Sequence, residues 1–270
     1  MGMTLGDWPP YRIFWSSAKF AFKALFSWLR PAMWLTQLLV LPLFQMAFFV
    51  YLSRFVNPTA TGVAFIAVGN ALQVASFSSI FAVCNLTSEE KWQGTLTPLI
   101  VTPASRFPLF VGRAMFQILN GMATIVVGFF YASMVFGVDM SRTDFLALAV
   151  VILVTCLAMT GFGLMLGSVG LYMRTAMIIA NIFLFIGLLI CGVNFPVTVL
   201  PTWLQPLSYA IPMTYGTIAA RAAVQGSSVT ELAPVILQEI GAGAGSIFVG
   251  YLLFLGFEAL ARRRGAFEEF

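Results

Sequence analysis

The side chains that could do chemistry are few in this sequence of 270 residues, and their types exclude most enzymatic sites. Histidine is absent, which removes His-based catalysis and the commonest transition-metal ligand. Cys84, Cys156 and Cys191 lie far apart within apolar stretches, so they form no close-spaced metal pair and we interpret them as packing residues. We therefore expect neither a catalytic residue nor a metal site in this chain.

Acidic residues are scarce within the apolar stretches. Glu239 and Glu258 are the candidates, and Glu258 lies four residues before Arg262, a spacing that favours an ion pair on a helix. Transporters driven by protons or sodium usually carry several ionisable groups at membrane depth. The scarcity argues against that class, which stays an alternative.

Amide side chains are a second kind of candidate. Asn70 and Gln73 share one helical face with Phe77, and amides at membrane depth usually turn away from lipid, toward protein or a water-filled path. Hydrogen bonding between helices and lining of a pathway are equally open for them. For the phenylalanines, which number 27, contact with lipid or packing is the stronger alternative. The candidate lining residues are Asn70, Gln73, Phe77, Asn181, Phe185 and Asn194.

The elements that must position these residues are membrane-spanning helices. The chain is 60% hydrophobic and 9% charged, with a mean hydropathy of +0.94, whereas soluble domains are about half apolar and a quarter charged. A span needs about 20 apolar residues, and we expect an all-α protein with six of them. The predicted spans are Met33–Tyr51, Val63–Leu86, Phe107–Phe136, Phe145–Val169, Ala176–Val193 and Val235–Ala261.

The positions of lysine and arginine orient these spans, because cytosolic connections carry an excess of both. With a cytosolic N-terminus, 11 of the 14 basic residues fall on the cytosolic side, and Arg54, Arg142 and Arg221 fall outside. Both termini are therefore predicted in the cytosol, and the protein in a bacterial inner (plasma) membrane. The bilayer is the expected surrounding, and no nucleic-acid partner is expected.

We divide the chain into three parts. Residues 1–30 form a cytosolic tail and an interfacial helix, residues 31–261 the six-span domain, and residues 262–270 a cytosolic tail. Within 11–30, polar side chains recur every three or four residues among aromatic ones. Such a basic amphipathic helix suits the surface of an anionic leaflet, although packing on protein is the alternative.

The stretch 194–216, NFPVTVLPTWLQPLSYAIPMTYG, lies between the fifth and sixth predicted spans. It is too apolar for an ordinary solvated loop, and prolines interrupt it too often for a span. Each proline removes a backbone donor and breaks a helix, so we expect the segment to bend repeatedly, and the charge count places it on the outer side.

A cytosolic hairpin, 87–106, lies between the second and third spans. Thr87 and Glu90 can form a capping box, and Glu89 also favours a helix N-terminus. Gly94 and Pro98 limit the helix to short pieces. Such a segment can dock on a membrane or on a soluble partner, and local physics leaves both open.

Two motifs resemble the permeases of the type-2 ABC exporter family, which have the type V exporter fold. The first motif is Glu90-x-x-x-Gly94-Thr95-Leu96-x-x-Leu99-x-x-Thr102-Pro103-x-x-Arg106. The second combines Gly192, Phe195-Pro196, Leu200-Pro201, Trp203-Leu204, Pro206-Leu207, Pro212, Thr214-Tyr215 and Arg221. The resemblance covers nearly the whole chain. Two departures concern the hairpin, where Trp92 and Thr97-Pro98 stand at positions at which the family often has acidic residues.

The resemblance implies two permease subunits, identical or homologous, and two copies of a separate ATPase that bind the hairpins. The chain itself has no G-x-x-x-x-G-K-[ST] motif, so ATP and magnesium are expected in the partner. The residues implied in ATPase coupling are Glu89, Glu90, Trp92, Gly94, Thr95, Leu96 and Leu99. The segment 194–216 is implied to be re-entrant and to cap the pathway, with Phe195, Pro196, Pro201, Trp203, Pro206, Tyr209 and Pro212 as the outer gate.

The expected function is therefore outward transport of an amphiphilic drug-like or lipidic substrate, as in daunorubicin-type exporters. Export of a polysaccharide or glycolipid is the first alternative. A secondary transporter and a non-transporting membrane scaffold are more distant ones.

Overall fold

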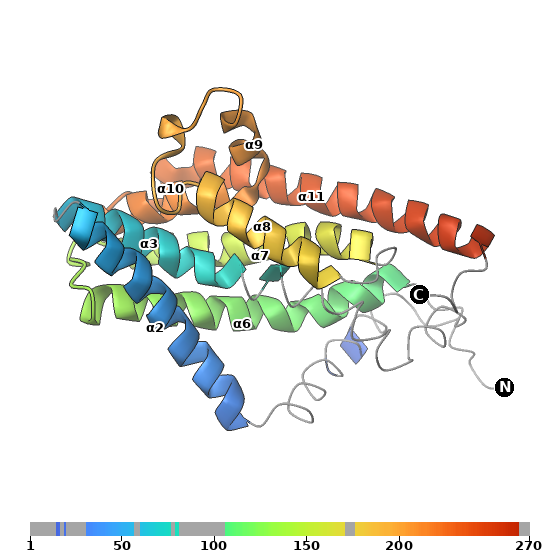
Figure 1. Ribbon diagram of the computed structural model, residues 1–270, viewed down its shortest axis with the longest axis horizontal. Coiled ribbons are helices and arrows are strands. Elements are labelled where there is room, and N and C mark those ends of the chain that lie inside the picture. The colour runs from blue at the N-terminus through green and yellow to red at the C-terminus, as the bar shows by residue number, and fades with distance from the viewer. Residues whose placement is uncertain are drawn as a thin grey trace.

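The computed structural model describes residues 15–16, 19, 31–56, 60–76, 79–80, 106–170 and 176–264. Within these residues every regular element is helical, which confirms the predicted all-α class (Figure 1). The long helices are α2 (Pro31–Val56), α3 (Ala60–Ser76), α6 (Arg106–Met134), α7 (Phe145–Gly170), α8 (Ala176–Ile190) and α11 (Val229–Arg264). Between α8 and α11 lie the short elements η3 (Val197–Val199), α9 (Gln205–Ala210) and α10 (Pro212–Val224).

Four of these helices are long and apolar enough to cross a membrane. They are α2, α6, α7 and α11, whose apolar windows cover Ala32–Val56, Gln117–Met134, Phe145–Val169 and Val229–Gly256. The other two predicted spans overlap α3 and α8, whose apolar parts are shorter, Gly62–Val74 and Ile178–Ile190. The second predicted span continues to Leu86, and most of its part beyond Ser76 lies outside the described residues. Helix α8 ends at Ile190, before the predicted Val193, because the chain turns at Gly192 with φ 69°, a conformation that favours glycine.

Helix α11 begins six residues before the predicted span, at Val229 rather than Val235. The cause is a capping box, in which the backbone N–H of Ser228 donates to the Glu231 carboxylate at 3.2 Å. The Ser-x-x-Glu spacing in the sequence indicates this earlier helix start, whereas the length of the apolar stretch alone does not.

The most extensive contact between helices in the described residues is that of α7 with α11. A Cβ at Gly243 would lie 2.7 Å from the Cβ of Ala158, and one at Gly250 would lie 2.8 Å from the Cα of Met165. Only glycine permits this approach, as is common between membrane helices. By contrast, a Cβ at Gly241 or Gly245 would meet no atom within 4 Å, so of these three glycines it is Gly243 that faces α7.

Helix α2 runs obliquely across the bundle, and its N-terminal end lies apart from the other helices (Figure 1). Large apolar side chains along it are exposed, among them Phe44, Phe48 and Phe55. Such a surface is typical of contact with lipid or with another protein, because soluble proteins rarely expose large contiguous apolar patches to water.

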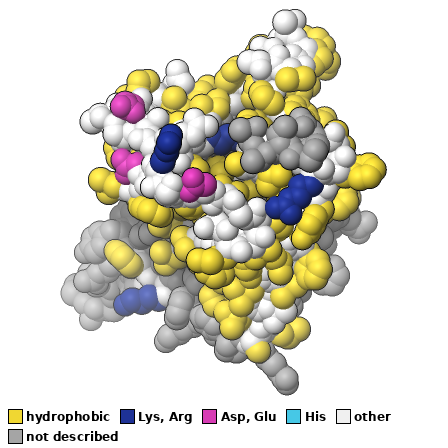
Figure 2. All heavy atoms as spheres, turned by 90° about the vertical axis from the view of Figure 1, so that its left-hand side faces the viewer, with side chains coloured by type: hydrophobic (Ala, Val, Ile, Leu, Met, Phe, Trp, Pro, Cys, Tyr) yellow, Lys and Arg dark blue, Asp and Glu magenta, His cyan; other side chains and the backbone are white. Residues whose placement is uncertain are grey.

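The two ends of the bundle differ in the connections they carry. The C-terminal ends of α2 and α6 lie at one end with the start of α11, whereas α6 begins and α11 ends at the other (Figure 1). Figure 2 views the first end, where charged side chains of both signs lie among hydrophobic ones. There Asp139 accepts a hydrogen bond from the backbone N–H of Ser141 at 2.9 Å, which with the nearby Arg142 lowers the pKa of Asp139 below its ordinary value.

Candidate functional site

The candidate site is the proline-rich segment after α8, residues 194–224, together with the helix ends that it contacts. We call it the outer segment, after the side of the membrane predicted for it. The polar side chains of α9 and α10 bind the carbonyls that α8 leaves free at its C-terminus. Thr217 Oγ1 donates to the Cys191 carbonyl at 3.0 Å, and the Ser208 hydroxyl donates to the Ile190 carbonyl. Because the last carbonyls of a helix have no partner within it, these two hydroxyls attach the outer segment to α8.

Three of the four prolines of this segment lie where helices begin, and Pro201 lies between η3 and α9. Pro196 directly precedes η3, Pro206 lies in the first turn of α9, and Pro212 lies in the first turn of α10. Proline is tolerated at these positions because the first N–H groups of a helix have no intrahelical acceptor. The segment thus bends repeatedly between short helical pieces, as predicted, but α10 continues to Val224, past the expected end at residue 216, because no proline follows Pro212 there.

The aromatic residues of the predicted gate differ in their surroundings. Trp203 is 76% exposed, whereas Tyr209 contacts Tyr215 with a centroid separation of 5.9 Å, and Phe195 is half-buried. In Figure 1, α9 and the chain before it project from the side of the bundle. Indole and phenol side chains that project in this way suit the headgroup region of a membrane.

Arg221 fixes α10 to two other elements. Its Nε and Nη2 donate to the Phe65 carbonyl of α3 at 3.2 and 3.1 Å, and Nη2 also donates to the Val193 carbonyl at 2.8 Å. A Cβ at Gly69 would lie 2.2 Å from the Val193 oxygen and 2.5 Å from Nη2. Glycine at position 69 therefore makes room for the arginine, a role that the sequence does not reveal.

Three of the predicted lining residues lie together between α3 and the end of α8. Asn70 Nδ2 donates to Asn194 Oδ1 at 2.9 Å, and Gln73 Nε2 donates to the Leu184 carbonyl at 3.4 Å. Asn70 and Gln73 are buried, and one carbonyl oxygen of each has no partner among the described residues. In this conformation the two amides form hydrogen bonds from α3 to α8 and to the turn after it, as in the first of the two alternatives, hydrogen bonding between helices.

The other predicted lining residues are not part of that group. Phe185 is 70% exposed on α8, Asn181 is half-exposed on the same helix, and Phe77 lies outside the described residues. The hairpin 87–106 also lies outside them except for Arg106, so the coupling residues from Glu89 to Leu99 stay predictions. Of the N-terminal interfacial helix only Trp15, Ser16 and Lys19 are described, and its prediction likewise stays open.

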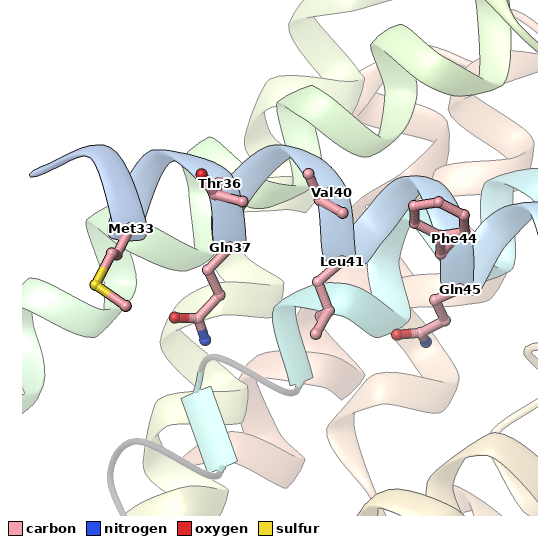
Figure 3. Close-up of a pocket in the computed structure, with 7 residues that line it drawn as sticks. All are labelled: Met33, Thr36, Gln37, Val40, Leu41, Phe44 and Gln45. Atoms are coloured by element: carbon pink, nitrogen blue, oxygen red, sulfur yellow. The ribbon is translucent and has the colours of Figure 1, made fainter.

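Helix α2 presents an open groove of about 640 Å³. Its lining residues are Met33, Thr36, Gln37, Val40, Leu41, Phe44 and Gln45. Figure 3 shows that all of them come from α2 itself, with the two glutamines directed to the same side. The groove is therefore a helix face, apolar with a few amide and hydroxyl groups, rather than an enclosed cavity.

These features define the class of the protein. Long apolar helices, a charged end, buried amides that join helices, and a proline-broken helical segment describe a polytopic membrane protein whose candidate site is the end of the bundle that carries this segment. Within the described residues no group of histidine, cysteine and acidic side chains could hold a metal ion.

Comparison with known proteins gives the family. Residues 15–224 match the family described as ABC-2 type transporter. The match covers 210 of 270 residues (224 − 15 + 1), so the chain belongs to the ABC-2 type transporter family, and the resemblance to type-2 ABC permeases is confirmed.

Two curated relatives carry the same name, "Probable multidrug ABC transporter permease YbhR", one from Escherichia coli strain K12 and one from Escherichia coli O157:H7. Each is 28% identical to this chain over 134 residues, which are 48% of this chain. The match spans only 35% of the length of each relative.

Proposed function

We propose that this chain is the membrane permease of an ABC exporter and that a separate ATPase drives it. The family match over residues 15–224 carries the proposal, because it includes both the cytosolic hairpin and the outer segment. The sequence has no phosphate-binding loop, which supports a division of labour in which ATP and magnesium bind the partner. The chain is then a transport component and not itself an enzyme.

The proposed substrate is an amphiphilic drug-like or lipidic molecule that moves outward. The printed name of the relatives, a multidrug permease, supports this class over a polysaccharide or glycolipid. The exposed aromatic side chains near the outer end, Trp203 and Phe185 among them, offer apolar surface to such a molecule.

The proposed topology has six spans with both termini in the cytosol of a bacterial cell. The four long apolar helices support it, together with α3 and α8 at the expected places. The charge distribution supports the same orientation, since only three of the 14 basic residues of the sequence, Arg54, Arg142 and Arg221, fall on the predicted outer side.

We also propose that two permease subunits assemble, each with one ATPase copy on its hairpin. The exposed face of α2 supports this, because a transmembrane helix with Gln37 and Gln45 on a lipid-facing side is costly unless another protein supplies partners. The second subunit is either a copy of this chain or a homologue. Cross-linking through cysteines on α2 distinguishes the two, because only a pair of identical chains gives a homodimer product.

Reconstitution in proteoliposomes tests the function. The permease and its ATPase are co-purified and inserted, and ATP-dependent movement of a fluorescent amphiphile is followed. Movement with ATP, and none with an ATPase variant that cannot hydrolyse it, is the expected result. Movement driven by an ion gradient alone would identify a secondary transporter, and ATPase binding without any movement would identify a scaffold.

A further inference from the structure

Glu239 is a buried acidic side chain to which the proposed function gives no role. It lies on α11 and is fully buried. Its Oε1 accepts a hydrogen bond from Thr155 Oγ1 of α7 at 2.7 Å, whereas its Oε2 has no partner among the described residues. A carboxyl group with two oxygens and four acceptor sites is thus left with one hydrogen bond.

The groups recorded against this carboxyl within the described part of the chain are neutral. They are the hydroxyl of Thr155 and the thiol of Cys156 from α7, and the backbone at Gly216 from α10. The cation on α10, Arg221, directs its guanidinium to the carbonyls of Phe65 and Val193 instead. An ionised carboxylate in this place would be both desolvated and unpaired, which is strongly unfavourable. These surroundings favour the neutral form of the carboxyl group.

Helix α10 covers the carboxyl directly. A Cβ at Gly216 would lie 2.7 Å from Glu239 Oε1 and 2.6 Å from Thr155 Oγ1, so the backbone of α10 rests on the hydrogen-bonded pair. Glu239 is ten residues into α11, roughly 15 Å along the helix from its outer end at 1.5 Å per residue. Movement of α10 away from α7 and α11 would admit water from the outer side to this depth.

We propose that Glu239 is a proton-binding site that holds the outer segment closed. With α10 seated, the carboxyl is neutral and the proton is bound. When α10 lifts, water solvates the carboxyl, and the proton leaves to the outer solution. The inference rests on the proposed function, an exporter with a pathway that opens outward, and adds to it that lifting of α10 opens the outer end.

The direction of the pH effect follows from which form holds the proton. Because the seated form binds it and the lifted form releases it, acid favours the seated form and alkali favours the lifted form. With one proton exchanged, the ratio of the two forms changes at most about tenfold per pH unit.

Amide hydrogen exchange of α10 in the full chain, bound to its ATPase in lipid nanodiscs, tests this. Wild type, Glu239→Gln and Glu231→Gln are compared at each pH, so that the intrinsic pH dependence of exchange cancels. Glu231 is the matched control, since it lies on the same helix but is exposed. The expected result is that protection of residues 212–224 falls with rising pH in wild type and Glu231→Gln, by up to tenfold per unit, and that Glu239→Gln removes this dependence. Equal profiles for wild type and Glu239→Gln would overturn the proposal.

A second variant keeps the test decisive if Glu239→Gln does not fold. The Thr155 hydroxyl donates to the carboxyl and so favours its ionised form. Thr155→Val should therefore move the profile toward alkaline pH, and Thr155→Ser should restore it. An unmoved profile in Thr155→Val would contradict the proposal. The exchange is measured without ATP or substrate, so its outcome does not depend on whether the protein exports anything. Conversely, a negative exchange result would not contradict the proposed exporter function.

Discussion

The guanidinium carbon of Arg221 lies 3.4 Å from the centre of the Phe65 ring, and the same side chain donates two hydrogen bonds to the Phe65 carbonyl. One residue of α10 thus holds both the face of an aromatic ring and the backbone of α3. A third hydrogen bond, to Val193, adds the turn after α8. The outer segment is joined to the second and fifth predicted spans by one charged side chain.

Replacing Arg221 by Ala should release α10 from α3. Two carbonyls would lose a charged donor, and each buried acceptor left unpaired costs about 1–3 kcal/mol. Arg221→Lys should restore only part of this, because an ammonium group cannot reproduce the planar fork or the ring contact. Thermal unfolding in detergent and exchange of residues 212–224 measure the effect. Equal stability of the Ala variant and wild type would show that the contacts contribute nothing.

Gly243 and Gly245 provide a matched pair on α11. Gly243→Ala should destabilise the bundle, because the new Cβ would lie 2.7 Å from Ala158 and the two helices would have to separate. Gly245→Ala adds the same methyl group to open space and should be neutral or stabilising by up to about 1 kcal/mol, as expected for Ala over Gly in a helix. The melting temperatures of both variants are compared with that of the wild type. A lower melting temperature for Gly245→Ala than for Gly243→Ala would mean that α11 is rotated about its axis.

Cysteine labelling checks the topology. In a background without native cysteines, a cysteine at Ser228 should react with an impermeant thiol reagent in intact cells. Cysteines at Lys91 and Arg264 should react only after the membrane is opened, because basic residues favour the cytosolic side. Labelling of position 91 from outside would reverse the predicted orientation.

The cytosolic hairpin is predicted to transmit the motion of the ATPase. Trp92→Ala should weaken ATPase binding by about 2 kcal/mol or more if the indole is an interface anchor, and Glu90→Lys should disrupt a charge contact. Pull-down of the ATPase and substrate-stimulated hydrolysis are the measurements. Normal binding and stimulation in both variants would place the contact on other residues, with Trp92 then an anchor in the inner leaflet.

The prolines of the outer segment give a test of the proposed gate. Replacing Pro201 and Pro206 together by Ala should allow the chain before α10 to form a longer helix. The expected result is impaired export with ATPase binding intact. Export at the wild-type rate would show that these helix breaks are not needed.

The sequence by itself determined the class of the protein and the order of its helices. Apolar length alone marks a helix such as α7, because every backbone group in a membrane must be paired within the segment. The closely spaced prolines of the outer segment likewise predict short helical pieces, since Pro206 and Pro212 each lie in the first turn of one. Charge counting and motif resemblance likewise need no coordinates.

Only the tertiary structure decided which side chains meet. Nothing local links Arg221 to Phe65, 156 residues away, or Glu239 to Thr155, 84 residues away. Apolar side chains are interchangeable in lipid, so their pattern does not specify which helix faces which. The faces are chosen by close approach and by the few polar groups that must find a partner, as at Gly243 and Asn70, and these depend on all the helices packing together.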